Sequence, residues 1–334
     1  MVDCINGGKN DSQRQQPWSL FGLRNNVKLI FVFLTITALL SLASMAKDVG
    51  ALERVLLEAT TEEKTVILTT LNRAWAEPNS TFDLFLEGFH VGVGTKRLLR
   101  HLVVVCMDEE AYSRCLEIHP RRCHLLKTPG IDFSGQKNYM TPDYLKMMWR
   151  RLEFLGSILE LGYNFLFTDM DIMWLRDPFP HLLSEVDFQI ACDRYNGNSR
   201  DPGNSVNAGF KFVQANHRTV KFYKYWYESR WTFCGKNEQD VFNIIKHDRF
   251  VKEELGLTMR FLGTVYFRGF CQMHREMEKI CTMHANCCLG LQNKINDLRQ
   301  VLQDWKYYLS TTDRRNMTWR SPDSCRRSRS KGKV

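Results

Sequence analysis

The chain has 334 residues, of which 44% are hydrophobic and 25% are charged, and its formal net charge is +9. This composition is typical of a globular protein with a sizeable core and excludes general disorder. Five basic residues lie within the last nine positions, and residues 1–28 carry four basic against two acidic side chains, so the body is near neutral. A near-neutral body argues against a nucleic-acid-binding protein, which needs a basic face on its folded domain.

A long apolar segment near the N-terminus predicts a membrane anchor. Residues 29–46 form an uncharged run of 18 residues, mostly Leu, Ile, Phe, Val and Ala. As a helix this run would be about 27 Å long, close to the thickness of the hydrocarbon core of a bilayer. Because Arg24 and Lys28 precede it, the positive-inside rule leaves the N-terminus in the cytosol and the body in the lumen, as in a type II membrane protein.

There are two other interpretations of this run. The first is a cleaved signal peptide, because Ser44 and Ala46 would suit a small-residue cleavage site, although a leader of 28 residues is long for such a signal. The second is a buried core helix, which the lack of a polar face disfavours. The anchor and the signal peptide both place the body in the secretory lumen. We expect a cytosolic tail at 1–28, a transmembrane signal anchor at 29–46 and a stem at 47–63.

The cysteines and two sequence triplets agree with a lumenal location. Ten of the eleven cysteines follow the apolar run, and an oxidising lumen favours disulfide bonds. Cys115 and Cys123 are close enough to close a short loop, and four cysteines cluster between positions 271 and 288, but the pairing cannot be read from the sequence. No pair has the CxxC spacing of a zinc site. The triplets that begin at Asn79 and Asn316 fit N-glycosylation.

The hydrophobic pattern of the body predicts alternating strands and helices. In chain order we expect a strand at 65–71, a helix at 82–94, a strand at 101–107, a helix at 141–162 and a strand at 165–168. This order predicts an α/β protein with a doubly wound, mostly parallel sheet.

Two aspartates follow the last of these strands. The apolar segment FLFT leads directly into Asp169 and Asp171. In open α/β sheets, ligands bind beyond the carboxyl ends of the strands. Two carboxylates at such a place suit Mn²⁺ or Mg²⁺, which would bridge to diphosphate oxygens and stabilise the charge on a nucleotide leaving group. The pattern therefore predicts a metal site, although so short a motif also arises by chance in a solvated turn.

Haloacid-dehalogenase-type phosphatases also place Asp-x-Asp at a strand end. In those enzymes the motif opens the domain and continues with Thr or Val two residues on. Here it comes more than 100 residues into the body, and position 173 is Met. Both differences disfavour a phosphatase.

Five ordered blocks resemble the plant nucleotide-diphospho-sugar transferases of glycosyltransferase family 77. The resemblance runs from about residue 65 to residue 309. It implies a GT-A fold over residues 64–310, a retaining sugar transfer, a divalent metal and residence in the Golgi. Residues 311–334 are expected to be a basic, disordered tail. The blocks are LTTLNRAWAEPNSTFDLFLEGF (68–89), LFTDMDIMWLRDPF (166–179), NAGFKFV (207–213), NEQDVFN (237–243) and HANCCLGLQNKINDLR (284–299).

The resemblance also implies roles for single residues. Asp169 and Asp171 match the metal motif of the family, and His284 matches its third metal ligand. Gln239 and Asp240 would be catalytic, with Asp240 near the anomeric carbon, where it would stabilise an oxocarbenium-like transition state. The residues implied to bind donor or acceptor are Thr69, Thr70, Asp169, Asn207, Ala208, Gly209 and Lys294.

The residues alone allow plainer interpretations of these positions. His284 would be an ordinary structural histidine, residues 207–210 a common turn, and Lys294 a solvated side chain. Asp240 would be an acid in the first turn of a helix, where it stabilises the helix dipole.

We therefore expect a retaining glycosyltransferase that moves a sugar from a UDP-sugar to a cell-wall polysaccharide or a hydroxyproline-rich glycoprotein in the Golgi, with Mn²⁺ or Mg²⁺ as cofactor. Its expected partners are the donor, the acceptor, the membrane through one N-terminal helix and other Golgi enzymes, and no nucleic acid. The main rival is a non-catalytic sugar-binding or scaffold protein on the same fold. A scaffold need not keep Asp169, Asp171 and Asp240. The motifs do not identify the donor or the acceptor.

Overall fold

The computed structural model describes residues 30, 32, 50–274, 276–315 and 317–331. The predicted cytosolic tail and the anchor at 29–46 lie outside these residues, apart from positions 30 and 32. Within the described part of the chain, no helix combines the length and the apolar character needed to cross a membrane. The segment expected to be a stem is helical over residues 50–59.

A seven-stranded sheet forms the centre of the body, which comprises residues 55–334. Its strands are β1 (Thr65–Leu71), β2 (Leu102–Cys106), β3 (Cys123–Leu125), β4 (Asn164–Thr168), β6 (Phe188–Arg194), β7 (Ser205–Val213) and β8 (Met259–Phe261). Their order is β3-β2-β1-β4-β7-β6-β8, in which β7 is antiparallel to both of its neighbours and the other four pairings are parallel. The α/β class and the predominance of parallel pairing are thus confirmed, and the β7 side of the sheet is mixed.

A second, three-stranded sheet adjoins the carboxyl end of β4. It contains β5 (Ile172–Trp174), β10 (Thr282–His284) and β9 (Phe267–Gly269) in the order β5-β10-β9. β10 pairs antiparallel with β5 and parallel with β9. Because β5 follows β4 after only three residues, the segment 169–171 is the turn that joins the two sheets.

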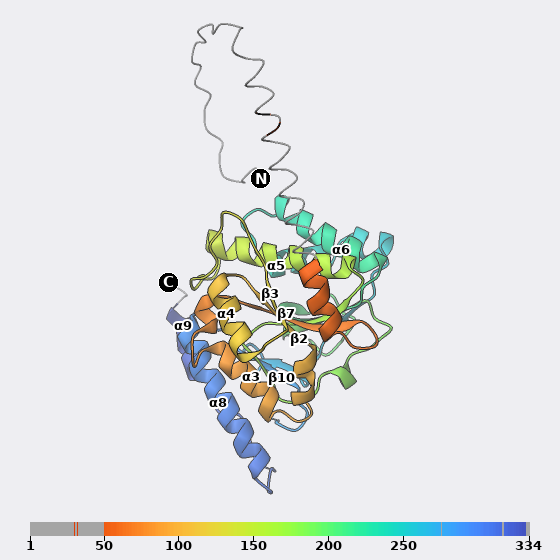
Figure 1. Cartoon of the computed structure of the whole chain (residues 1–334). Coiled ribbons are helices and arrows are strands. Elements are labelled where there is room, and N and C mark those ends of the chain that lie inside the picture. The colour runs from red at the N-terminus through yellow and green to blue at the C-terminus, as the bar shows by residue number, and fades with distance from the viewer. Residues whose placement is uncertain (1–29, 31, 33–49, 275, 316, 332–334) are drawn as a thin grey trace, which may run out of the picture. The chain divides into compact units, whose positions relative to one another are not determined.

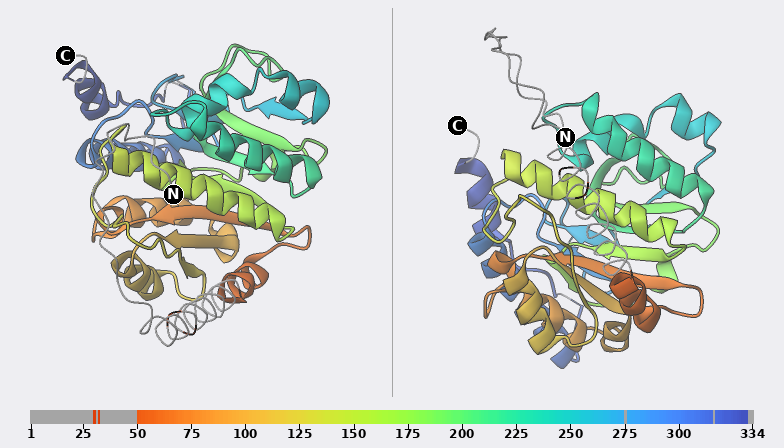
Figure 2. Two further views of the ribbon diagram at one scale, coloured as in Figure 1. Left: turned by 90° about the horizontal axis from the view of Figure 1, so that it is seen from above. Right: turned by 45° about the horizontal axis from the view of Figure 1, so that its top comes forward.

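Helices cover both faces of the large sheet (Figure 1). α5 and α6 lie side by side on one face, and α3 and α8 lie on the other, as both views in Figure 2 also show. Thr141 caps α5 by accepting a hydrogen bond from the Tyr144 N–H, and Gly162 follows the helix with a φ of 80°, as the sequence predicted. The helices are α2 (Arg73–Ala76), α3 (Thr81–Val91), α4 (Glu109–Ile118), α5 (Pro142–Glu160), α6 (His217–Glu228), α7 (Glu238–Ile245), α8 (Leu291–Ser310) and α9 (Asp323–Lys331).

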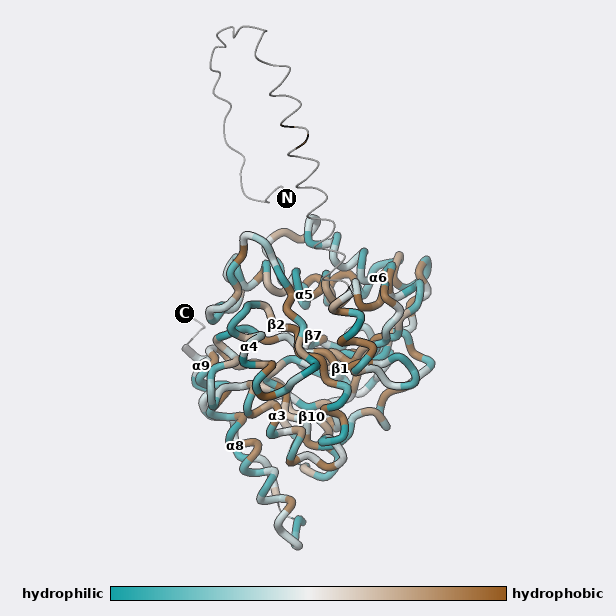
Figure 3. Tube along the Cα trace, viewed as in Figure 1, coloured by the Kyte–Doolittle hydropathy of each residue, from teal (hydrophilic) through white to brown (hydrophobic). Residues whose placement is uncertain are grey.

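Alternate residues of the central strands pack on opposite faces of the sheet, because side chains of a strand alternate in direction. On the α3 side, Ile67 and Leu71 of β1 join Phe85 and Phe89 in one buried cluster. Trp174 of β5 stacks on Phe89 with ring centroids 4.4 Å apart, which ties the small sheet to the same cluster. Each such side chain stabilises the fold by about 1.5–3 kcal/mol. Figure 3 shows the apolar residues concentrated in these central strands.

Three disulfides cross-link the body. Cys115 pairs with Cys123 within a short loop, as the spacing suggested, and two adjacent cysteines in the 271–288 cluster pair with different partners. The pairs are Cys115–Cys123, Cys271–Cys287 and Cys288–Cys325.

The region 311–334 is not a disordered tail throughout, because residues 323–331 form α9. The physical reason is twofold. Cys325 is covalently joined to Cys288, and the carboxylate of Asp297 accepts hydrogen bonds from the backbone N–H groups of Ser324 and Cys325. The basic composition that suggested disorder gave no sign of these two attachments.

Asp187, just before β6, connects three elements at the far side of the sheet. Its side chain is 5% exposed and receives two hydrogen bonds from Arg218 and two from Thr258. Burial works against the charged form, but these hydrogen bonds lower the pKa of Asp187 from 3.8 to about 2. Asp187 therefore stabilises the fold above pH 4 and loses this effect as the pH falls from about 4 towards 2.

We predict that Asp187→Asn lowers the free energy of unfolding by about 1–2 kcal/mol at pH 7, because the amide keeps the shape but loses the charge-assisted hydrogen bonds. Urea unfolding at pH 7 and at pH 3 measures this effect, and the difference from the wild type should shrink at pH 3. The exposed Asp313→Asn is the control and should leave the midpoint unchanged. An equal loss at both pH values would show that the ionised carboxylate is not the cause.

Candidate active site

A cavity of about 550 Å³ opens at the carboxyl ends of β1 and β4. These two strands are neighbours in the sheet. From β1 the chain continues to β2 and β3 on one side, and β4 lies on the other side of β1, so the strand order reverses between β1 and β4. Ligands of open α/β sheets bind where the strand order reverses in this way. Thr70, at the end of β1, and Asp169, just after β4, both line the cavity. Its volume lies within the range of about 300–1,000 Å³ that is usual for small-molecule sites.

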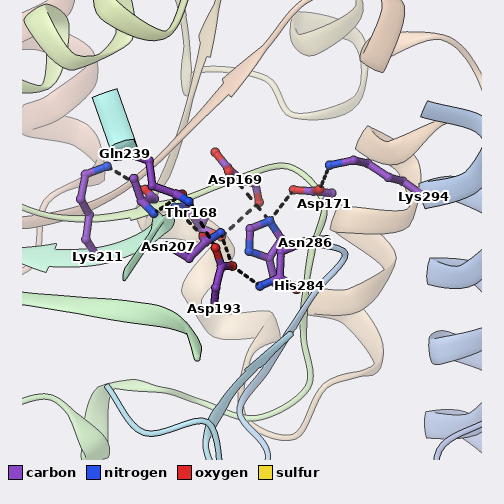
Figure 4. Close-up of polar contacts among 12 residues, drawn as sticks. Thr168, Asp169, Asp171, Asp193, Asn207, Lys211, Gln239, His284, Asn286 and Lys294 are labelled. Carbon is purple, nitrogen blue, oxygen red and sulfur yellow. Dashed lines mark hydrogen bonds and ion pairs between the residues drawn. The ribbon is translucent and has the colours of Figure 1, made fainter. Parts of the chain in front are cut away.

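Three side chains in this cavity form a cluster that can hold a metal ion. One oxygen each of Asp169 and Asp171 and one nitrogen of His284 all lie within 4.8 Å of one another. Nε2 of His284 is 3.1 Å from Oδ1 of Asp171 and 3.9 Å from Oδ2 of Asp169 (Figure 4). Two carboxylates and one imidazole fit Mn²⁺ or Mg²⁺, and the nitrogen ligand favours Mn²⁺ of the two.

Strand pairing brings this cluster together across more than 100 residues. Asp171 immediately precedes β5, and the β5–β10 register places His284 opposite Ile172. The backbone N–H of Ala285 donates to the carbonyl oxygen of Asp171, which extends the pairing past the histidine. His284 is therefore positioned by the pairing of β10 with β5, which the spacing of the two aspartates along the chain does not reveal.

Charge balances the buried aspartate of the cluster. Nζ of Lys294, on α8, lies 2.5 Å from Oδ2 of Asp171. Burial acts to raise the pKa of Asp171, but Lys294 and His284 lower it below its usual value, so the carboxylate stays ionised. Burial likewise acts to lower the pKa of His284, whereas Asp171 raises it, so protons compete with a metal for this imidazole.

Gly209 of β7 leaves the space that the cluster occupies. A Cβ atom at this position would lie 2.5 Å from Oδ2 of Asp169 and 2.6 Å from Cε1 of His284. The carbonyl oxygen of Gly209 accepts a hydrogen bond of 2.7 Å from the N–H of Asp169, which fixes the start of the turn 169–171. Only glycine allows the β7 backbone to approach the aspartate this closely.

A buried arginine links the cluster to the start of α7. Arg151, on α5, donates to Oδ1 of Asp169 at 2.6 Å and to Oε1 of Glu238 at 2.7 Å. Burial works against its charge, but the two carboxylates raise the pKa of Arg151 above its usual value. The other oxygen of Glu238 is buried and has no hydrogen-bond partner among the described residues, although Glu238 lines the cavity. A buried carboxylate oxygen without a partner is rare in folded proteins, so it marks Glu238 as a candidate functional residue.

Three amide side chains surround a further acid, Asp193. Asn207 and Asn286 donate to its Oδ1 at 2.9 and 2.7 Å, and Gln239 donates to its Oδ2 at 3.2 Å (Figure 4). Burial raises the pKa of Asp193, and the hydrogen bonds partly offset this effect. The network fixes four polar groups that line one side of the cavity.

Lys211 supports the backbone beside this network from outside the cavity. Its buried Nζ donates to the carbonyl oxygen of Ala208 at 2.9 Å and lies 4.3 Å from the ring centroid of Phe167. Burial lowers the pKa of Lys211 from 10.5 to about 7. On the other side, the N–H of Ala208 donates to Oε1 of Gln239, so this peptide sets the orientation of the glutamine.

The structure brings most of the residues singled out in the sequence into one cavity. Besides the three cluster residues, its lining includes Thr70, Asn207, Gly209, Gln239 and Lys294.

Three of the sequence-predicted residues do not line the cavity. Thr69 is fully buried, and its side chain lies on the face of β1 opposite to that of Thr70. Ala208 takes part only through its backbone, which contacts Gln239 and Lys211. Asp240 accompanies Gln239 in α7 but lies outside the lining. The backbone N–H of Asp240 donates to the capping side chain of Asn237, which is the ordinary environment of an acid in a first helical turn.

Sequence reasoning missed Arg151, Asp193, Glu238 and Asn286. Arg151 lies in the middle of an amphipathic helix, where a charged residue is expected to face solvent. Glu238 lies within the block 237–243 that carries the resemblance, but the resemblance implied roles only for Gln239 and Asp240 in that block. The signal for Asp193 was its place at the end of an apolar segment, before the polar stretch 195–203.

Residues 97–298, more than half of the chain, match the model of the family described as Nucleotide-diphospho-sugar transferase. The uncharacterized protein At4g15970 of Arabidopsis thaliana is 61% identical over 84% of this chain and 74% of its own length. A second Arabidopsis relative, the UDP-D-xylose:L-fucose alpha-1,3-D-xylosyltransferase MGP4, is 23% identical over 64% of this chain and 65% of its own length.

Among solved structures, mouse xyloside xylosyltransferase 1 in its apo form aligns with 67% of this chain and 98% of its own, at 14% sequence identity and a TM-score of 0.40.

We predict that Gly209→Ala weakens Mn²⁺ binding at least about tenfold, because the new methyl group displaces two of the three ligands and small displacements of a metal shell are costly. Isothermal titration calorimetry with Mn²⁺ measures the affinity, and thermal unfolding checks the fold.

Gly156→Ala is the matched control, since a Cβ atom in this part of α5 would meet Tyr223 at an ordinary 3.6 Å. Equal Mn²⁺ affinities for Gly209→Ala and Gly156→Ala would contradict the assignment of the cluster as a metal site.

Proposed function

Because this chain belongs to the nucleotide-diphospho-sugar transferase family, we propose that it is a metal-dependent, retaining glycosyltransferase that uses a UDP-sugar. In this reaction the bond between the anomeric carbon and the diphosphate oxygen breaks, and an acceptor hydroxyl oxygen bonds to the same carbon. UDP leaves, and the hydroxyl proton is released. The observation that carries the proposal is the cluster of Asp169, Asp171 and His284 in a cavity at the carboxyl ends of β1 and β4.

Different residues of the cavity would serve different parts of this reaction. Asp169, Asp171 and His284 would hold the metal ion. A divalent cation bound there supplies positive charge that stabilises a diphosphate leaving group. Lys294, which contacts Asp171, adds a second positive charge on the same side. Asp193 and its amide neighbours offer fixed hydrogen-bonding groups for sugar hydroxyls.

Glu238 takes the electrostatic role that the sequence suggested for Asp240. Glu238 lines the cavity, one of its oxygens has no partner among the described residues, and Arg151 holds the other oxygen in place. A fixed negative charge there stabilises the positive charge that develops at the anomeric carbon. Gln239 beside it, held by the Ala208 N–H and by Asp193, positions a polar group at the same end of the cavity.

Features outside the site support a proposed location. Three disulfides favour an oxidising compartment, and the apolar run at 29–46 suits a single-pass type II anchor. We therefore propose a Golgi membrane protein whose body is lumenal. The relative named as a xylosyltransferase uses UDP-xylose and fucose, so UDP-xylose is the first donor to test. A cell-wall polysaccharide or a hydroxyproline-rich glycoprotein is the acceptor class proposed.

We predict that the purified chain releases UDP from one sugar donor in the presence of Mn²⁺ and that EDTA abolishes this release. UDP-xylose, UDP-arabinofuranose, UDP-galactose and UDP-glucose form the panel, and a coupled UDP assay gives the rate. The double variant Asp169→Ala/Asp171→Ala should lose activity by at least about a hundredfold, because the metal ligands are removed. Asp313→Ala, an exposed acid far from the cluster in sequence, should retain it.

If no donor turns over, calorimetry with Mn²⁺ and UDP decides between two explanations. Binding without turnover would favour a non-catalytic sugar-nucleotide protein on this fold. No binding by the folded chain would contradict the proposed donor site. Nuclear magnetic resonance of the first product would test retention, because the anomeric coupling of the transferred sugar must match that of the donor.

We predict that Glu238→Gln lowers kcat by about a hundredfold or more, because the neutral amide cannot stabilise developing positive charge. Gln is isosteric and its carbonyl oxygen still accepts from Arg151, so the fold should be kept, as circular dichroism can check. Asp240→Asn is the matched control and should lower kcat by less than about threefold, as expected for a residue outside the lining. A reversed result, with Asp240→Asn inactive and Glu238→Gln active, would return the catalytic role to Asp240.

A further inference from the structure

α9 is fastened to the wall of the cavity by three different contacts. The Cys288–Cys325 disulfide joins it covalently to a cavity-lining residue. The carboxylate of Asp297, on α8, binds the first N–H groups of the helix. The backbone N–H of Leu289 donates to Oγ of Ser328 at 3.0 Å. These contacts fix the helix against residues 287–289, which form that part of the wall.

The spacing of residues in α9 points one arginine at the cavity. Cys325, Ser328 and Arg329 stand at positions i, i+3 and i+4, so they share one face of the helix. The first two contact the wall, and Arg329 itself lines the cavity. Arg326 and Arg327 occupy other faces and do not line it, and Arg326 donates to Oγ of Ser321.

Arg329 is a cation whose partner is not supplied by the described residues. The acids that line the cavity already have partners. Arg151 binds Asp169 and one oxygen of Glu238, Lys294 binds Asp171, and side-chain amides bind Asp193. In the described part of the chain, no hydrogen bond or ion pair engages the guanidinium of Arg329. A positive group held at a cavity wall without a protein partner is suited to an anionic ligand.

Resting on the proposed function, we propose that Arg329 binds the diphosphate of the nucleotide donor. The planar guanidinium matches phosphate oxygens with paired N–H groups. Lys294 belongs to the part of α8 that contacts α9, since Sγ of Cys325 lies 3.6 Å from the carbonyl oxygen of the neighbouring Asn293. α9 thus completes the donor pocket from a part of the sequence beyond residue 298, where the family match ends.

The test compares UDP, UMP and uridine as ligands of the full chain in Mn²⁺ by calorimetry. Arg329→Ala should weaken UDP binding about fivefold to tenfold, the loss of one charge-assisted hydrogen bond at an exposed site. Uridine binding should not change, because uridine has no phosphate. Arg327→Ala removes the same charge from the same helix and should leave the UDP affinity within about twofold. The UDP affinity of Arg329→Lys should fall between those of the wild type and Arg329→Ala.

Three results would overturn the proposal. Equal UDP affinities for Arg329→Ala, Arg327→Ala and the wild type would show that α9 is not part of the donor pocket, while the proposed function stands. An unchanged UDP affinity in Arg329→Ala with a raised KM for a uronate-bearing acceptor would assign the arginine to an acceptor carboxylate instead. A wild-type chain that is folded and binds no UDP would sink both the inference and the proposed function.

Discussion

The antiparallel pairing of β10 with β5 is the contact on which the candidate site depends. β5 begins directly after Asp171, so any strand that pairs with it reaches the turn between the two sheets. The three residues of β10 bring His284 to this turn and, just beyond it, Asn286 to Asp193. The Cys271–Cys287 and Cys288–Cys325 disulfides follow immediately and hold the chain that leaves the site. One short pairing therefore connects the cluster of Asp169, Asp171 and His284, the amide network and α9.

Charge is the second constraint, and it explains which residues surround the cavity. Its lining contains four acidic side chains, four lysine or arginine side chains and His284, so the acids are matched by basic groups before any ligand binds. Burying isolated carboxylates is costly, and Arg151 and Lys294 remove that cost by pairing. A bound divalent cation and a diphosphate would preserve the same balance. The basic groups that remain outside these pairs lie on the cavity wall, where Arg329 is one of them.

Much of the fold could be predicted from local signals. The apolar runs gave the parallel strands, and Thr141 and Gly162 marked both ends of α5, because capping and left-handed conformations depend on single residues. The antiparallel β7 and the helix α9 could not be predicted in this way. Strand direction depends on how the chain returns to the sheet, and α9 depends on a disulfide and on Asp297, both distant in sequence. Composition alone made the α9 segment look disordered.

The sequence by itself determined the Asp169-x-Asp171 motif and the block that contains α7, because a strand end followed by two acids and a capped helix are local patterns. Only the tertiary structure decided which neighbours in these patterns line the cavity. Glu238 lines the cavity and Asp240 does not, since a helix turns about 100° per residue and its orientation is set by packing. Arg151, Asp193 and Asn286 belong to the site for the same reason. Each lies on a different element, and only the folded sheet brings those elements together.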